Sequence, residues 1–229
     1  GRALTPGRMD LLLDSHVAAH VVGRLAPLFF GDQHDALLQA RTREGRDPFA
    51  APVLSLIDDA SAPGGPIRTV RDAEGTPKRR TVLVEAGRLA GRLTDVETAS
   101  RMDGPLSGNA VRLTWSDPPR IGVTNFYIDP SPGVSPLDLL ASVSKGFYAA
   151  VLLERPEVDL AADKFRLLVA GYTVEKGRVA ERISECGISG RLSELLRGVA
   201  ALGDDLKFVA GAGGGVGSPT LYVPRWKIS

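Results

Sequence analysis

The sequence predicts an α+β fold built mainly from antiparallel β-sheet or barrel. Segments rich in β-branched and aromatic residues outnumber the segments with helical periodicity, and the two kinds do not alternate regularly. Two pairs of the expected strands are joined by short turns that contain glycine, at residues 86–88 and 175–177, which is typical of β-hairpins. No fixed-period repeat divides the chain, and we expect residues 1–229 to form a single domain.

The first half of the chain is expected to hold one substantial helix. Residues 10–13 predict a short buried strand, after which Asp14 or Ser15 is placed to cap a helix that runs to about Phe29. Pro27 predicts a kink or an early end in that helix. The later elements expected here are a polar loop at 32–50 with one helical turn at 36–39, a strand at 52–57, a turn region at 58–66, strands at 80–85 and 89–94, a helical turn at 95–102 and a strand at 111–115.

The clearest local signal is a strand, a turn and a capped helix at residues 124–146, TNFYIDPSPGVSPLDLLASVSKG. Ser135 is predicted as the N-cap, Pro136 as the first helical residue and Gly146 as the C-cap. After this segment we expect a strand at 147–154, a hairpin of strands at 165–174 and 178–183, a helix from 189 or 191 to 201, a strand at 207–210, a glycine loop at 211–217 and a last strand at 220–223.

Composition and charge exclude several classes of function. The 229 residues are 43% hydrophobic and 24% charged, which is ordinary for a globular domain. Twenty-eight basic and 27 acidic residues leave a formal net charge of +1, and no basic block extends beyond residues 78–80, so we expect no nucleic-acid partner. No apolar run approaches the roughly 20 residues that span a membrane, so we expect no membrane partner and a cytoplasmic location.

Two histidines one helical turn apart, His16 and His20, are the strongest candidates for metal ligands. The i, i+4 spacing lets both side chains reach one zinc ion, as in HExxH peptidases. Position 17 is Val, however, where that chemistry needs a glutamate base, and helical periodicity places both histidines beside Arg24 on the polar side. We therefore favour solvated histidines, and a zinc site made by His16, His20 and Cys186 is the alternative.

The single cysteine and the C-terminal glycines provide no clear catalytic motif. Glu185 beside Cys186 disfavours a thiolate, so a structural thiol is expected. The glycine run lacks the Lys-Ser/Thr pair of a phosphate-binding Walker loop. It predicts instead a mobile loop, or a place where a partner's backbone approaches closely. The candidates for a peptide or partner interface are Gly211, Gly213, Gly214, Gly215 and Gly217.

Carboxylate pairs occur at residues 58–59, 72–74 and 204–205. Each pair lies next to glycine, proline or the end of an expected helix. We therefore interpret these carboxylates as groups that form turns and cap helices rather than as an acid–base pair.

Nearly the whole chain resembles the PmbA/TldD (TldE) proteins. GVTNFYIDPSPG (122–133) is similar to the TNxxIxPG element of that family, and further matching blocks occur in the same order. These blocks are LSLIDDA (54–60), the stretch 72–99, LSGNAVR (106–112), VAGYTVEKGRV (169–179), the stretch 188–206 and SPTLYVPRWKI (218–228). The resemblance implies the C-terminal half of one subunit of a cytoplasmic, zinc-dependent peptidase with two kinds of subunit. Family members have an additional N-terminal domain, so we expect this chain to be a fragment or one piece of a split protein.

The resemblance also implies which subunit this is. Catalytic TldD subunits carry HExxxH on the first helix and a cysteine ligand in a CGK stretch near the C-terminus. The matching stretches here read HVAAHVV (16–22) and GAGGGVGS (211–218), without the glutamate or the cysteine. Both departures match a PmbA/TldE subunit. The resemblance thus implies no catalytic residue, no metal and no other cofactor in this chain, with zinc in the partner.

The predicted function is that of a non-catalytic PmbA/TldE-like subunit. It would pair with a TldD-like zinc subunit, in a heterodimer or a higher assembly, and help enclose an unfolded or precursor peptide. A separate N-terminal half is a further candidate partner. Two alternatives stay open: an independent zinc hydrolase that uses His16 and His20, and a peptide-binding scaffold without turnover.

Overall fold

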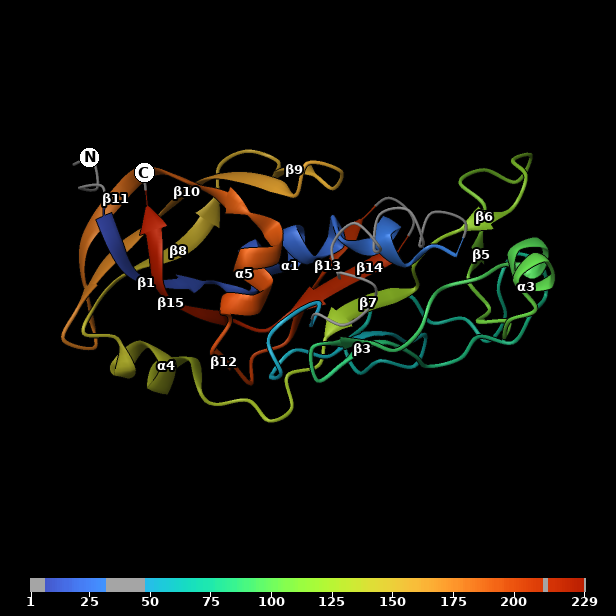
Figure 1. Cartoon of the computed structure of the whole chain (residues 1–229), viewed down its shortest axis with the longest axis horizontal. Coiled ribbons are helices and arrows are strands. Elements are labelled where there is room, and N and C mark those ends of the chain that lie inside the picture. The colour runs from blue at the N-terminus through green and yellow to red at the C-terminus, as the bar shows by residue number, and fades with distance from the viewer. Residues whose placement is uncertain (1–6, 32–47, 212–213, 229) are drawn as a thin grey trace.

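Two twisted β-sheets with a helix between them form the framework of the chain (Figure 1). The computed structural model describes residues 7–31, 48–211 and 214–228. All but two of the strand pairings among these residues are antiparallel, the parallel ones being β1 with β8 and β14 with β7. The predicted α+β class with mainly antiparallel sheet is confirmed.

The larger sheet lies at the end of the molecule where both ends of the described chain are found (Figure 1). Its strand order is β11-β10-β8-β1-β15-β12, and β9 pairs with β10. The strands are β1 (Gly7–Leu13), β8 (Lys145–Leu152), β9 (Glu157–Asp159), β10 (Lys164–Glu175), β11 (Arg178–Arg191), β12 (Ala201–Leu202) and β15 (Leu221–Ile228). Helices α4 (Pro136–Ser142) and α5 (Leu192–Gly198) belong to this half.

The second sheet has the order β13-β14-β7-β2-β3-β4. It consists of β2 (Leu56–Asp58), β3 (Thr81–Glu85), β4 (Arg88–Leu89), β7 (Asn125–Ile128), β13 (Lys207–Gly211) and β14 (Gly214–Ser218). Beyond it lie the short ribbon of β5 (Ala110–Val111) and β6 (Arg120–Ile121) and helix α3 (Val96–Met102), at the far end of the molecule (Figure 1).

Helix α1 (Ser15–Gly23) links the two sheets, because it packs against β8 of the first sheet and against β7, β13 and β14 of the second. Asp14 caps it by accepting a hydrogen bond from the His16 backbone N–H at 3.0 Å. A 3-10 turn, η1 (Ala26–Phe29), follows, so the α-helix ends before Pro27 rather than at Phe29. One apolar cluster extends from α1 into both sheets, and it includes Leu11, Val22 and Phe126.

Local sequence signals located several elements correctly. Ser135 caps α4 with Pro136 in the first turn, and Ala86-Gly87 adopt positive φ of 46° and 77° between β3 and β4. Lys176-Gly177 do the same, at 50° and 76°, between β10 and β11. Each of these turns and caps depends on residues that are adjacent in the sequence, which is why they could be predicted.

Other predicted boundaries were wrong where long-range pairing decides the structure. The strand expected at 52–57 is only β2, and the strand expected at 111–115 is only β5. Gly146 does not cap α4, because the helix ends before Val143. Gly146 lies in β8 instead, where it pairs with Asp10 of β1. The helical turn predicted at 36–39 falls outside the residues that the structure describes.

Strand β15 continues through Pro224 to Ile228, beyond the last strand predicted at 220–223. The register between β1 and β15 shifts between Met9 and Leu11, so an irregularity of the ladder lies opposite the proline. There the Arg225 backbone N–H donates to the Asp10 carboxylate at 3.0 Å. A proline without an N–H is compatible with a strand at such a bulge. Among the described residues, no helix has the length and apolar content needed to cross a bilayer.

We predict that Gly171→Ala strongly destabilises the fold. An added Cβ would lie 1.9 Å from the Tyr148 carbonyl oxygen in the neighbouring strand, at a shift in register between β10 and β8. Forcing the strands apart is expected to lower the free energy of unfolding by about 3 kcal/mol. Urea denaturation measures the change. Gly7→Ala is the control, since no atom lies within 4 Å of its added Cβ, and equal effects of the two substitutions would contradict the prediction.

Candidate functional site

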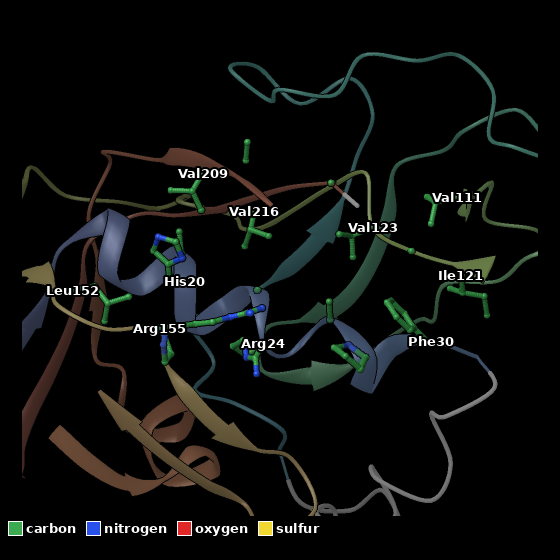
Figure 2. Close-up of a pocket in the computed structure, with 18 of the residues that line it drawn as sticks. His20, Arg24, Phe30, Val111, Ile121, Val123, Leu152, Arg155, Val209 and Val216 are labelled. Carbon is green, nitrogen blue, oxygen red and sulfur yellow. The ribbon is translucent and has the colours of Figure 1, made fainter. Parts of the chain in front are cut away.

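A cavity of about 880 Å³ lies beside α1, between the two sheets and the β5–β6 ribbon (Figure 2). Four parts of the chain contribute: α1 with the turn after it, the β5–β6 ribbon, the segment after β8, and the β13–β14 hairpin. Its apolar lining includes Phe30, Val111, Ile121, Val209 and Val216. The volume is large enough for several amino-acid side chains, so this cavity is the candidate functional site.

The close approach of α1 to β14 defines one wall of the cavity. A Cβ added at Gly23 would lie 3.1 Å from the Val216 side chain, so the helix backbone lies directly against this side chain of the strand. Ala19 and Gly23 line the cavity from the helix, and Gly214 and Val216 line it from the strand. Small residues at this crossing therefore determine how near the helix comes to the sheet.

The described C-terminal glycines form strand rather than loop, which corrects the predicted mobile loop. Gly211 is the last residue of β13, and Gly214, Gly215 and Gly217 lie in β14, which pairs with β13 on one side and with β7 on the other. Gly213 lies outside the described residues. A Cβ at Gly215 would lie 2.5 Å from Pro66, and one at Gly217 would lie 2.8 Å from Phe208. The glycines thus permit close packing within this chain, and their contact with a peptide or partner remains a prediction.

The two candidate histidines have different surroundings. Both are exposed on α1, as helical periodicity predicted, but only His20 lines the cavity. Partial burial and then the nearby His16 lower the pKa of the His20 imidazole below its usual 6.5. Val17, where a zinc peptidase of the HExxH type has its glutamate, is buried in the core. His20 is therefore a largely neutral side chain at neutral pH that faces the cavity without a carboxylate beside it on the helix.

Cys186 lies in the middle of β11 and pairs with Val169 of β10. The sequence had placed it after a shorter strand, so the boundary was wrong, although a structural thiol agrees with its surroundings. It is 6% exposed within the apolar core, and burial raises the pKa of its thiol to about 11. Within the described ranges, no cluster of three or more His, Cys, Asp or Glu side chains could hold a metal ion. The structure thus does not bring His16, His20 and Cys186 together as a ligand set.

The polar lining of the cavity is dominated by arginine. Arg24 comes from the end of α1, Arg120 from β6, and Arg155 from the segment after β8, where Glu154 also lines the cavity. Helical periodicity placed Arg24 beside the histidines, and no pattern in the sequence pointed to Arg120 or Arg155. They come from three separate segments, and no local motif connects them.

The β5–β6 ribbon is positioned by a buried carboxylate. Asp58 of β2 is 1% exposed, and its two carboxylate oxygens accept hydrogen bonds from the Thr124 N–H at 2.7 Å and from Asn109 Nδ2 at 2.6 Å. Asn109 Nδ2 also donates to the Gly122 carbonyl at 3.0 Å. Asn109 precedes β5 and Gly122 follows β6, so in this antiparallel pair they lie at the same end, and these bonds fix that base of the ribbon to the second sheet.

Lys78 completes this network. Its Nζ donates to Thr124 Oγ1 at 2.7 Å and to the Gly108 carbonyl at 3.2 Å. Burial raises the pKa of Asp58, while hydrogen bonds from Asn109 and Thr124 and the charge of Lys78 oppose that rise. Burial lowers the pKa of Lys78, whereas the negative charges of Asp58 and Asp72 raise it. Asp58 was predicted to belong to a turn, which is wrong, and its partners Asn109 and Thr124 are too distant in the sequence to have been recognised.

Two of the other carboxylates do form turns. Asp59 accepts from the Ser61 N–H at 2.7 Å, and Asp72 accepts from the Glu74 and Thr76 N–H groups. For these two residues, the interpretation as turn-forming groups is confirmed. Asp205 instead accepts from the Thr220 N–H at 2.8 Å and so connects two segments that are distant in the sequence.

Comparison with known proteins identifies the family. A model of the PmbA/TldA metallopeptidase C-terminal domain matches residues 6–229. The chain belongs to the PmbA/TldD family. A metalloprotease from Archaeoglobus fulgidus is 31% identical over 223 residues, which cover 94% of this chain and 50% of that protein. One from Methanothermobacter thermautotrophicus is 28% identical over 210 residues, covering 90% and 45%. The chain thus spans at most about half the length of these PmbA/TldD relatives.

Solved structures share the fold over the whole chain. TldE from Thermococcus kodakarensis superimposes with a TM-score of 0.85 at 20% identity, covering 100% of this chain and 51% of that one. A protein from Thermotoga maritima, described as a putative modulator of a DNA gyrase, gives 0.82 at 21% identity, with 100% and 51% coverage. These likenesses establish the PmbA/TldD fold of the chain.

We predict that Asp58→Ala lowers the free energy of unfolding by about 2–4 kcal/mol. The substitution leaves the Thr124 N–H and Asn109 Nδ2 without their buried acceptor and removes the anion that faces Lys78. Thermal and urea denaturation measure the loss. Asp204→Ala is the matched control, because Asp204 is exposed. Comparable stability of the two variants would show that the buried network contributes little.

Proposed function

We propose that this chain is a PmbA/TldE-like subunit that binds peptide beside a TldD-like subunit, which contributes the catalytic zinc. The main support is the composition of the cavity wall on α1. That wall presents one histidine and an arginine, whereas the residue after His16 is a buried valine. A hydrolytic zinc site needs three protein ligands and a base. The described residues contain no cluster of three His, Cys, Asp or Glu side chains that could hold the ion.

Peptide binding is supported by the strand that borders the cavity. Among the described strands, β13 pairs only with β14 and forms an edge of the second sheet, and its residues Val209 and Ala210 line the cavity. An edge strand offers unpaired N–H and C=O groups to an extended peptide and holds it largely independently of sequence. An unfolded or precursor peptide is the substrate class that such binding suits.

The zinc hydrolase alternative has less support from the geometry. It needs His16, His20 and Cys186 around one ion, yet Cys186 belongs to the apolar core and His16 does not line the cavity. A peptide-binding scaffold without turnover would use the same cavity and the same edge strand, β13. Only activity measured with a partner subunit distinguishes it from the favoured proposal.

The proposal predicts that the purified chain contains much less than one equivalent of zinc and does not cleave peptides. With a zinc-bearing TldD-like subunit that co-purifies from the native host, the mixture cleaves unstructured peptides. Elemental analysis measures the metal, and mass spectrometry detects the products. A stable peptide complex with no products in any mixture would favour the scaffold.

The double substitution of His16 and His20 by alanine serves as the test of the ligand set. Because both side chains are exposed, the fold should tolerate the change, and the zinc content should stay as in the unsubstituted chain. Stoichiometric zinc in the isolated chain that disappears in this variant would overturn the proposal in favour of an independent hydrolase.

A further inference from the structure

The cavity beside α1 is more basic than the chain as a whole. Its lining contains three arginines, Arg24, Arg120 and Arg155, and one acidic residue, Glu154. With His20 neutral, the lining therefore has a formal charge of +2. The entire chain of 229 residues carries only +1. Positive charge is therefore concentrated at this cavity.

Among the residues that the structure describes, no partner explains this charge. The ion pairs and hydrogen bonds formed among the described residues include none from the side chains of Arg24, Arg120 or Arg155. The end of α1 attracts a cation through its dipole, which accounts for Arg24. It does not account for Arg155, which comes from the segment after β8 and lines the same cavity.

One end of the cavity is basic and the other is mainly apolar; Arg120 is the charged residue of the second end, since it pairs with Val111 in the β5–β6 ribbon. Figure 2 shows His20, Arg24 and Arg155 gathered in one part of the cavity, while Val111 and Ile121 line the opposite part. A guanidinium group donates paired hydrogen bonds to a carboxylate or a phosphate. The mainly apolar end suits an organic molecule whose anionic group lies some distance from an apolar side chain.

We propose that this cavity binds a carboxylate of an extended peptide at Arg24 and Arg155, with an apolar side chain of the same peptide at Val111 and Ile121. The peptide as occupant rests on the proposed function, because the β13 edge beside the cavity would hold the main chain. The carboxylate comes from an acidic side chain or from the C-terminus, and both offer the same two oxygens to the arginines. The proposal makes this chain the subunit that selects acidic or C-terminal segments.

The test uses fluorescently labelled, unstructured peptides and the purified chain. The first peptide carries one Glu, one Leu and an amidated C-terminus; the second has Gln in place of Glu; the third has Gln and a free C-terminal carboxylate. We expect the first or the third to bind roughly tenfold more tightly than the second, the effect of a charge-assisted hydrogen bond. Whichever of them shows the gain identifies the source of the carboxylate.

The matched variants are Arg24→Gln with Arg155→Gln, and Arg178→Gln as the control. Arg178 is exposed at the start of β11 and does not line the cavity. The double variant should bind all three peptides equally, and the control should keep the preference. Circular dichroism melting checks that each variant folds, and the single variants replace the double one if it does not.

Several results would overturn the proposal. Equal binding of the three peptides by the unsubstituted chain would do so, as would a preference that survives in the folded arginine variants. A phosphoserine peptide that binds tenfold more tightly than the glutamate peptide would reassign the site to phosphate. Carboxylate-dependent binding without cleavage in any partner mixture would leave this inference intact and reject the peptidase role. Cleavage in a partner mixture without carboxylate-dependent binding would support the peptidase role and reject this inference.

Discussion

The close contact of α1 with the glycine strand β14 couples the two sheets, the apolar core and the cavity. Gly23 brings the helix to Val216, and Gly215 and Gly217 let β14 lie against Pro66 and Phe208. The same crossing joins the two sheets through one apolar cluster and forms one wall of the cavity. A side chain at Gly215 or Gly217 would displace the residues packed against β14, and one at Gly23 would require the Val216 side chain to move, so the core and the site share one packing requirement.

The sequence could predict the features whose causes are local. Asp14 and Ser135 cap helices through hydrogen bonds to residues two positions later, and Gly87 and Gly177 adopt the positive φ that their hairpin turns need. The fold class followed from the same signals, because hairpins and short strands predict antiparallel sheet. The family resemblance relied on motifs of the same kind.

What the sequence could not predict depends on distant partners. A glycine run has low intrinsic preference for strand, yet β14 forms because β7 and β13 lie close on either side. Asp58 resembles a turn residue beside Asp59, and only the fold brings Asn109 and Thr124 to its two oxygens. In the same way, the arginines of the cavity come from separate elements, so their common site is visible only in three dimensions.

The two functional proposals depend on the same charges. A divalent cation in the basic part of the cavity would be repelled by Arg24 and Arg155, and at an effective dielectric constant near 20 each charge pair is worth on the order of a few kcal/mol at close range. The same guanidinium groups attract a carboxylate and compensate for its loss of hydration. A pair of subunits in which one holds zinc and the other holds an anionic part of the peptide would therefore divide the work electrostatically. In this view, the buried Val17 after His16 and the arginines beside α1 would serve the same division of roles.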